Sequence, residues 1–231
     1  MKVSSRFAKT GVFPKTTKVV HVEFGNSGHV RSHFIFTTVS RRRVFPMRHA
    51  QILQADRSVL VVVDMQEPFL RRIFERERVL QNCRLLIQTA NILKVPVIAT
   101  LQYAQKMGGV VPEIAEVLPQ GCEPIDKMCF SCYGSEPFRA ALMASERTQV
   151  VVCGVEAHIC VMQTALDALG AGFQVQVAED AVSSRSRENW QIAMRRLRHA
   201  DVVVTCTESV VYEWLVQAGT DEFRQILPLV K

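Results

Sequence analysis

From Ser58 onward, short apolar runs alternate with longer segments in which apolar residues recur every three or four positions. The short runs are rich in Val and Ile and are bounded by Gly, Pro or polar residues, which is typical of strands buried on both faces of a parallel sheet. Strands are therefore predicted at 58–64, 96–101, 149–153, 173–178 and 201–206. The longer segments have the period of amphipathic helices. Helices are predicted at 79–93, 135–146, 159–169, 186–199 and 208–216.

This alternation predicts an α/β fold. Strands that alternate with helices of about 10 to 15 residues form βαβ units with right-handed crossovers. We expect a three-layer α/β/α architecture with a parallel, doubly wound, Rossmann-like sheet of about five to six strands. In such a sheet, ligands bind outside the carboxyl ends of the strands. The residues that follow each apolar run are therefore the first candidates for chemistry.

The first 50 residues lack both periodicities and are basic. They contain ten Lys or Arg residues and one acid, Glu23, whereas residues 51–231 contain 18 basic and 21 acidic residues. Three interpretations of residues 1–50 stay open: an organelle transit peptide, a non-native extension upstream of a start at Met47, or a disordered arm for anionic partners. We predict a basic extension at 1–50, disordered or non-native, and a folded domain at 51–231.

The composition of the folded part narrows the function classes. No apolar run approaches the roughly 20 residues that a membrane span needs, so no membrane partner is expected. The excess of acidic residues gives no electrostatic reason to expect nucleic acid. Seven cysteines form an odd set, and several lie in apolar runs, which favours a reducing compartment over a disulfide framework. We expect a cytoplasmic protein, organellar only if residues 1–46 are a transit peptide.

Asp64 and Cys160 each follow a predicted strand. Asp64 ends the first strand, where a carboxylate can act as a base or cap the next helix; the sequence favours neither. Cys160 lies in VVVCGVEAHICVMQTALDAL, and this strand, turn and helix place it in the first helical turn. There the macrodipole and unpaired N–H groups favour a thiolate and could hold an oxyanion. The alternative is a buried, inert cysteine.

Lys127 and a nearby cysteine pair also have two interpretations. Lys127 lies in GCEPIDKMCFSCYG, a loop-like stretch between helical segments. It could stabilise a thiolate or balance Asp64, although most lysines are solvated. Cys129 and Cys132 form a CxxC motif, which without a second pair is a poor zinc site and does not open a helix as redox motifs do. No nucleotide or metal motif is present, so neither a cofactor nor a metal is expected.

These segments resemble the isochorismatase-like cysteine hydrolases, closest to the isochorismatase domain-containing subgroup. The resemblance runs from about Ala55 to the C-terminus, and five segments carry it: VLVVVDMQEPF, DKMCFSCYG, VVVCGVEAHICVMQTALDAL, AEDAVSSRSRENWQIAMRRL and AGTDEFRQIL. It implies that residues 51–231 form one hydrolase domain. It further implies a catalytic triad of Asp64, Lys127 and Cys160.

The resemblance also implies the surroundings of the triad. A non-proline cis peptide maps to Val155–Glu156, and the backbone N–H groups of Glu156 and Cys160 would form the oxyanion hole. Candidate residues of the substrate pocket are Gln66, Phe69, Gln102, Tyr103 and His158. Relatives that hydrolyse nicotinamide hold a metal through an Asp and two histidines, whereas TLQYAQKMG here has no histidine. The resemblance therefore implies a site without metal.

Three functions compete at this point. The first is a cysteine-dependent hydrolase of a small amide, imide or ester that forms a thioester intermediate, since an intact cysteine favours acyl chemistry. The second is a catalytically idle relative that serves as a binding or scaffold protein. The third is a thiol redox protein that uses Cys129 and Cys132. The expected partners are a small-molecule substrate and further copies of the chain in a homo-oligomer.

Overall fold

The computed structural model describes residues 48–231. The predictions for residues 1–47, including the start at Met47, lie outside the described residues. Within 48–231, no helix has both the length and the apolar character needed to cross a bilayer.

Six parallel strands form one sheet in the order β3-β2-β1-β4-β5-β6. Their bounds are β1 (Ser58–Val63), β2 (Val97–Gln102), β3 (Ile125–Lys127), β4 (Gln149–Val155), β5 (Gln174–Ser183) and β6 (Val203–Thr205). The chain starts in the middle of the sheet, runs outward to β3, and returns past β1 to build the other half. This confirms the predicted α/β fold with a parallel sheet of five to six strands.

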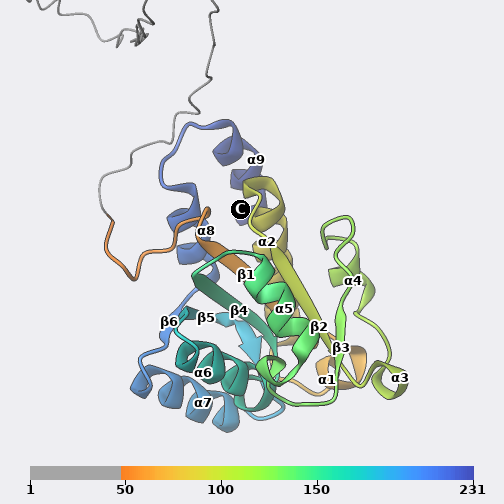
Figure 1. Cartoon of the computed structure of the whole chain (residues 1–231). Coiled ribbons are helices and arrows are strands. Elements are labelled where there is room, and N and C mark those ends of the chain that lie inside the picture. Colours follow the sequence, from red (N-terminus) through yellow and green to blue (C-terminus); the bar gives the residue numbers. More distant parts are fainter. Residues whose placement is uncertain (1–47) are drawn as a thin grey trace, which may run out of the picture. The chain divides into compact units, whose positions relative to one another are not determined.

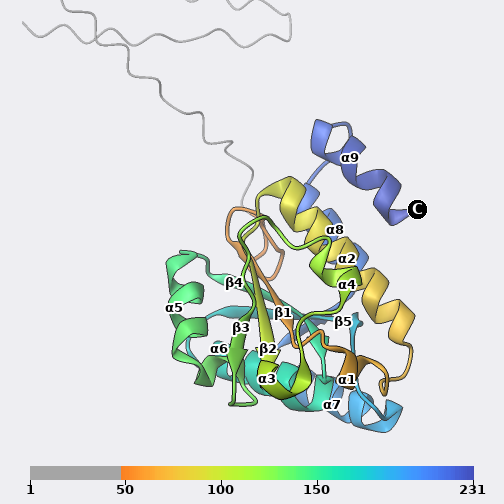
Figure 2. The same cartoon turned by 90° about the vertical axis from the view of Figure 1, so that its right-hand side faces the viewer.

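Helices cover both faces of the sheet (Figure 1). Those before β4 are α1 (Glu67–Leu70), α2 (Arg76–Leu93), α3 (Ala104–Met107), α4 (Pro112–Ala115), the 3-10 turn η1 (Cys132–Gly134) and α5 (Glu136–Ala144). Those after β4 are the π-helical turn η2 (Ala157–Val161), α6 (Met162–Gly170), α7 (Arg187–His199), α8 (Thr207–Leu215) and α9 (Asp221–Val230). The turned view shows α2 and α8 on one side of the sheet and α5 and α6 on the other (Figure 2).

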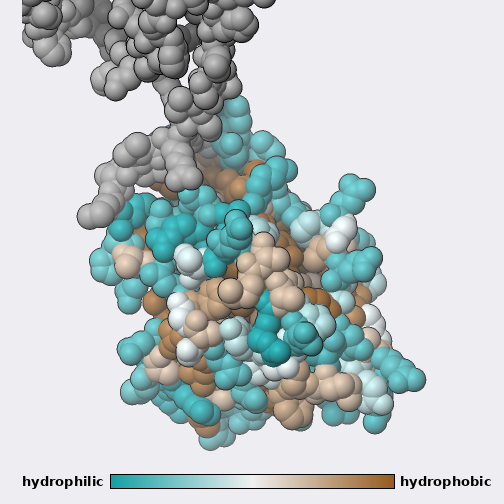
Figure 3. All heavy atoms as spheres, viewed as in Figure 1, coloured by the Kyte–Doolittle hydropathy of each residue, from teal (hydrophilic) through white to brown (hydrophobic). Residues whose placement is uncertain are grey.

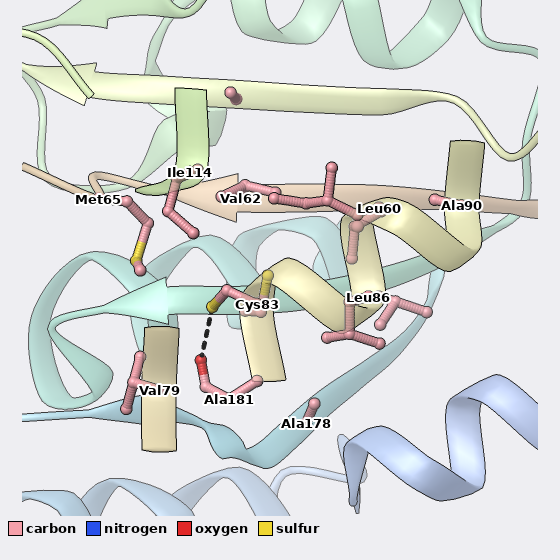
Figure 4. Close-up of a cluster of buried hydrophobic side chains, with 14 of the residues drawn as sticks. Leu60, Val62, Met65, Val79, Cys83, Leu86, Ala90, Ile114, Ala178 and Ala181 are labelled. Atoms are coloured by element: carbon pink, nitrogen blue, oxygen red, sulfur yellow. Dashed lines mark hydrogen bonds between the residues drawn. The ribbon is translucent and has the colours of Figure 1, made fainter. Parts of the chain in front are cut away.

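β1 is buried along its whole length because alternate side chains enter two different cores. Leu60 and Val62 pack with residues of α2 in one cluster, and Val59, Val61 and Val63 pack with residues of α5, α6 and α7 in the other. Figure 4 shows the first cluster, in which the Cys83 thiol donates to the carbonyl oxygen of Ala181 at 3.4 Å. Burial on both faces explains why residues 59–63 of this strand are all apolar.

Besides the short elements α1, α3, α4 and η1, the strand β3 and the helix α9 were missing from the sequence prediction. β3 has only three residues, one of which is the exposed Asp126, so no apolar run marks it. Lys127, predicted in a loop-like stretch, is the last residue of this strand. α9 buries Ile226 against Val211 and Leu215 of α8. It also contains Pro228, and a proline within a segment argues against a helix there.

Gly154 allows β4 to lie close to β1 at the point where the chain turns toward η2. Its φ is +109°, a conformation that L residues with side chains rarely adopt. A Cβ atom there would overlap the backbone of Val63, including its carbonyl oxygen. One residue further along, the peptide bond between Val155 and Glu156 is cis. Glycine at 154 therefore sets how closely the ends of β1 and β4 approach each other.

Candidate active site

Asp64 lies at the carboxyl end of β1 with a positive φ of 50° and is 1% exposed. Aspartate is among the few residues other than glycine that adopt this conformation readily. Its Oδ1 accepts a hydrogen bond from Thr100 Oγ1 at 2.8 Å, and its Oδ2 accepts one from Lys127 Nζ at 2.8 Å. The N-cap of the following helix α1 is Gln66, without a side-chain cap bond. The structure therefore decides against the capping interpretation of Asp64.

Lys127 is a buried cation with four oxygen atoms around it. Besides Asp64, its Nζ donates to Gln102 Oε1 at 2.7 Å and to the carbonyl oxygens of Cys129 and Phe130, both at 3.3 Å. The side chain is 0% exposed, so the interpretation as a solvated surface lysine is wrong. Each of the three strands β1, β2 and β3 supplies one member of this group: Asp64, Gln102 and Lys127.

The pKa of Lys127 is raised although burial, the largest single influence, lowers it. The charge of Asp64 and its hydrogen bond, together with the Cys132 and Cys160 thiols, outweigh burial. The ammonium therefore stays protonated through the physiological range. A permanent positive charge lies next to the carboxylate.

Cys160 lies in η2, the π-helical turn that follows β4, and is 7% exposed. Such turns occur frequently at functional sites. Burial raises the pKa of its thiol well above the ordinary range, and the charge of Asp64 and a hydrogen bond with Asp64 raise it further, while Lys127 opposes them. The expectation of a resting thiolate is therefore corrected: desolvation and the carboxylate outweigh the helix. At rest the sulfur holds its proton, within hydrogen-bonding reach of Asp64.

The thiol and the carboxylate line one cavity of about 430 Å³. Apolar side chains and arginines form most of its walls, and Glu156 is an acidic lining residue in addition to Asp64. The lining residues are Asp64, Pro68, Phe69, Arg71, Arg72, Gln102, Met107, Phe130, Val155, Glu156, Ile159, Cys160 and Arg185. An open space beside a protonated thiol and a carboxyl group paired with a buried ammonium suits attack on a small carbonyl compound.

Of the five predicted pocket residues, only Phe69 and Gln102 line this cavity. The prediction is corrected for the other three. Gln66 is fully buried and its Nε2 donates to the carbonyl oxygens of Gln102 and Gly108, which makes it structural. Tyr103 precedes α3 as its N-cap.

His158 also lies outside this lining, although it is two residues from the thiol. Its Nδ1 is 2.9 Å from Ser184 Oγ, in a hydrogen bond between η2 and the segment after β5. Burial lowers its pKa. This contact fixes η2 against the end of β5, so His158 supports the turn that carries Cys160.

Sequence reasoning missed Thr100, which contacts the buried pair, and the position of Cys132 beside Thr100. Thr100 holds Asp64 from the middle of β2, and its Oγ1 is 3.6 Å from Cys132 Sγ. The backbone N–H of Cys132 donates to Thr164 Oγ1 at 2.8 Å. The only sequence signal for Thr100 is its hydroxyl group, which stands in an otherwise apolar predicted strand next to residues that face the core.

The CxxC pair does not have the properties of a redox motif. Cys132 is fully buried, and burial followed by the charge of Asp64 raises its pKa to about 11. Reactive dithiols need a lowered pKa and partial exposure. Cys129 and Cys132 are both free thiols. Across residues 48–231, no group of three His, Cys, Asp or Glu side chains has the arrangement of a metal site.

Alkylation of Cys160 by iodoacetamide is expected to be slow at neutral pH and to accelerate by about tenfold per pH unit between pH 7 and 9. A raised pKa means that the reactive thiolate is a small fraction below that pKa and grows with pH. The measurement is the rate of modification of the Cys160 peptide by mass spectrometry, with the exposed Cys206 as internal reference. A rate for Cys160 that is flat across this range would contradict the expectation.

The Asp64→Asn variant tests, by the same measurement, whether the carboxylate controls the reactivity of Cys160. The substitution removes the negative charge and the hydrogen bond that hold the proton on sulfur, and leaves the Lys127 ammonium, which stabilises a thiolate. Labelling of Cys160 at pH 7 is therefore expected to become faster in this variant. Labelling that stays equal or slows would show that the carboxylate does not control the thiol.

Comparison with known proteins shows which family and which individual proteins this chain is similar to. The isochorismatase domain family matches residues 58–209 of the chain. The secreted isochorismatase effector Isc1 of Phytophthora sojae is 37% identical over 177 residues, which cover 75% of this chain and 84% of the relative. Isochorismatase domain-containing protein 2 of Danio rerio is 36% identical over 173 residues, which cover 75% and 86%.

Solved structures agree with this fold. One described as the MAR1 ribonuclease of Caenorhabditis elegans has a TM-score of 0.73 and 32% identity, and the match covers 77% of this chain and 91% of that chain. YcaC of Escherichia coli, described as an octameric hydrolase of unknown specificity, has a TM-score of 0.71 and covers 80% and 89%. At 22% identity the likeness to YcaC concerns the fold alone.

Proposed function

Because the chain belongs to the isochorismatase domain family of hydrolase-fold proteins, we propose that it is a cysteine-dependent hydrolase of a small amide, imide or ester. The observation that carries this proposal is the position of three groups around one cavity. The thiol of Cys160 and the carboxylate of Asp64 line the cavity, and the buried ammonium of Lys127 is 2.8 Å from the carboxylate. We assign the roles of nucleophile, base and charge partner to these three residues.

The first half-reaction follows from the protonated state of the thiol. Asp64 takes the proton from Cys160 as the sulfur bonds to the substrate carbonyl carbon, so a free thiolate need not accumulate. Lys127 balances the negative charge that moves between sulfur and carboxylate. The backbone N–H groups of Glu156 and Cys160 hold the oxyanion. The oxyanion collapses, the bond to the leaving group breaks, and the leaving group takes the proton from Asp64.

The second half-reaction returns the enzyme to its starting state. A water molecule gives one proton to Asp64 as its oxygen bonds to the thioester carbon. The carbon–sulfur bond then breaks, the acid product leaves, and Asp64 returns the proton to the sulfur. Thr100 and Gln102 position the reacting groups, since one donates to Asp64 and the other accepts from Lys127.

Two other functions have less support. A catalytically idle binding protein does not need a buried ion pair beside a thiol at an open cavity, and a redox role is opposed by the raised pKa of Cys132. A ribonuclease activity, suggested by the description of the Caenorhabditis elegans relative, has less support because residues 51–231 hold more acidic than basic residues. We therefore propose a small-molecule substrate, without nucleic acid, membrane or cofactor.

We further propose a cytoplasmic location and a homo-oligomeric state. Free cysteines suit a reducing compartment, although the relative Isc1 is described as secreted. Met128, Phe130 and Met143 are exposed by 65%, 57% and 64%, and apolar residues gather over α5 among hydrophilic ones (Figure 3). Exposed apolar side chains of this size are typical of contact surfaces. Light scattering of the purified chain measures the assembly.

Trapping of the thioester tests the hydrolase proposal. The chain is incubated with a panel of small amides, imides and esters, quenched in acid and mapped by mass spectrometry. We expect an acyl adduct on the Cys160 peptide that hydroxylamine removes, because hydroxylamine cleaves thioesters. A Cys129→Ala variant should form the same adduct. Turnover without any adduct, or an adduct confined to Cys129, would contradict the assigned nucleophile, and cleavage of a control oligoribonucleotide would favour the ribonuclease.

A further inference from the structure

The cavity beside Cys160 has a surplus of positive charge. Three arginines line it, Arg71, Arg72 and Arg185, together with the acids Asp64 and Glu156. Both acids already hold a cation. Asp64 is paired with Lys127, and Glu156 with Arg185 at 3.2 Å.

Arg185 is held in place by this pairing. Its backbone N–H and its Nε both donate to Glu156 Oε2, at 2.9 Å and 3.2 Å. The positive charge of Arg185 is therefore balanced by Glu156, and several of its N–H donors are already engaged in hydrogen bonds with that carboxylate. Arg185 closes the wall of the cavity and offers little net charge to a ligand.

Arg71 and Arg72 differ from Arg185 in having no partner. Within residues 48–231 neither guanidinium makes an ion pair or a side-chain hydrogen bond, and both residues are exposed. They follow α1 directly, next to Phe69, on the cavity wall formed by the segment after β1. Two unpaired positive charges thus face the entrance of the cavity that contains the thiol.

The rest of the lining includes apolar side chains, among them Phe69, Met107, Phe130 and Ile159. A ligand in this cavity can therefore offer a carbonyl to the sulfur, apolar groups to these side chains, and a group that pairs with guanidinium. Guanidinium groups bind carboxylates through paired N–H donors with matching geometry.

We propose that Arg71 and Arg72 recognise a carboxylate carried by the substrate, so that the chain acts on an amide or ester of a small acid that has its own negative charge. This inference rests on the proposed function, because it takes Cys160 as the nucleophile. It assigns Arg71 and Arg72 to substrate binding and leaves the chemistry to Asp64, Lys127 and Cys160.

The two alkylating agents iodoacetate and iodoacetamide test this inference without a known substrate. They differ in one group, which is a carboxylate in the first and a neutral amide in the second. The measured quantity is the ratio of their rates at Cys160, read from the Cys160 peptide and divided by the same ratio for free N-acetylcysteine. We expect this normalised ratio to be about 10 at low salt and to fall as salt is added.

The Arg71→Gln/Arg72→Gln variant is expected to reduce the normalised ratio by about fivefold or more, while the rate with iodoacetamide changes little. The matched control is Arg195→Gln/Arg196→Gln, which removes two exposed adjacent arginines of α7 that do not line the cavity. The control should keep the ratio of the wild-type chain. An unchanged ratio in the Arg71/Arg72 variant, or an equal fall in the control, would overturn the inference.

Competition separates a small acid from a larger anion. Succinate is expected to slow labelling of Cys160 by iodoacetate in the wild-type chain and to lose this effect in the Arg71→Gln/Arg72→Gln variant. Protection by a short oligoribonucleotide at concentrations where succinate has no effect would overturn the assignment to a small carboxylate. These labelling experiments do not depend on turnover. If the chain forms the acyl adduct but shows no preference for iodoacetate, only the proposed recognition of a carboxylate is refuted. If no acyl adduct forms, the proposed function itself is refuted.

Discussion

Alanine in place of Cys160 is expected to reduce hydrolysis of any amide that the wild-type chain accepts by at least about 1,000-fold, because the bond-forming sulfur is lost. The free energy of unfolding should change by less than about 1 kcal/mol, since the sulfur borders an open cavity and leaves no enclosed void. The measurements are initial rates on the same substrate and urea unfolding of both chains. Together they separate loss of chemistry from loss of structure.

The matched control for Cys160→Ala is Cys206→Ala, which removes an exposed thiol outside this cavity. It should keep the wild-type rate within about twofold. If Cys160→Ala retained a substantial part of the activity, water attack assisted by Asp64 alone would explain hydrolysis better than a thioester. If both cysteine variants lost activity, the effect would not be specific to the proposed nucleophile.

Methionine in place of Lys127 is expected to destabilise the folded chain by about 3–5 kcal/mol, because it leaves the buried carboxylate of Asp64 without its charge partner. Only the Thr100 hydroxyl and the Cys160 thiol, both neutral, would then donate to that carboxylate. Gln102 Oε1 and two backbone carbonyl oxygens would lose their donor as well. The change is measured as the shift in urea midpoint, followed by the fluorescence of Trp190 and Trp214.

The double variant Asp64→Asn/Lys127→Met tests the cause of that loss. It removes both charges, and replacing a buried ion pair as a unit is often close to neutral. We expect it to be more stable than Lys127→Met alone by about 2 kcal/mol or more. A double variant that is as unstable as the sum of the two single variants would show that lost packing, not an unpaired charge, dominates.

The parallel sheet and the two-sided burial of its central strands could be predicted from the sequence. Continuous runs rich in β-branched residues, such as 58–63, are typical of strands buried on both faces. β3 could not, because its three residues include an exposed acid and form too short a run to show alternation. The register that places Gln102 beside Lys127 is set by pairing between strands. No local pattern encodes such a contact.

The candidate site shows the same division. Asp64 and Cys160 could be found because Asp64 comes at the end of a strand and Cys160 lies in the turn after one, and the resemblance added Lys127. Thr100 and Cys132 were missed because their importance depends on contacts with residues far away in the chain. The state of the Cys160 thiol was also wrong, because a local argument from the helix does not include the carboxylate and the burial that the fold brings to the sulfur.

The ammonium of the site is supplied by the outermost strand on its side of the sheet. β3 has three residues and pairs with β2 alone, so its backbone has few ladder hydrogen bonds to hold it. Edges of this kind open at lower free energy than the centre of a domain. Activity would accordingly be lost on heating at a lower temperature than the one at which the domain unfolds. Local opening of β3 moves the ammonium of Lys127 out of the site while β1, β4 and β5 stay ordered. On cooling, activity would return without refolding of the core.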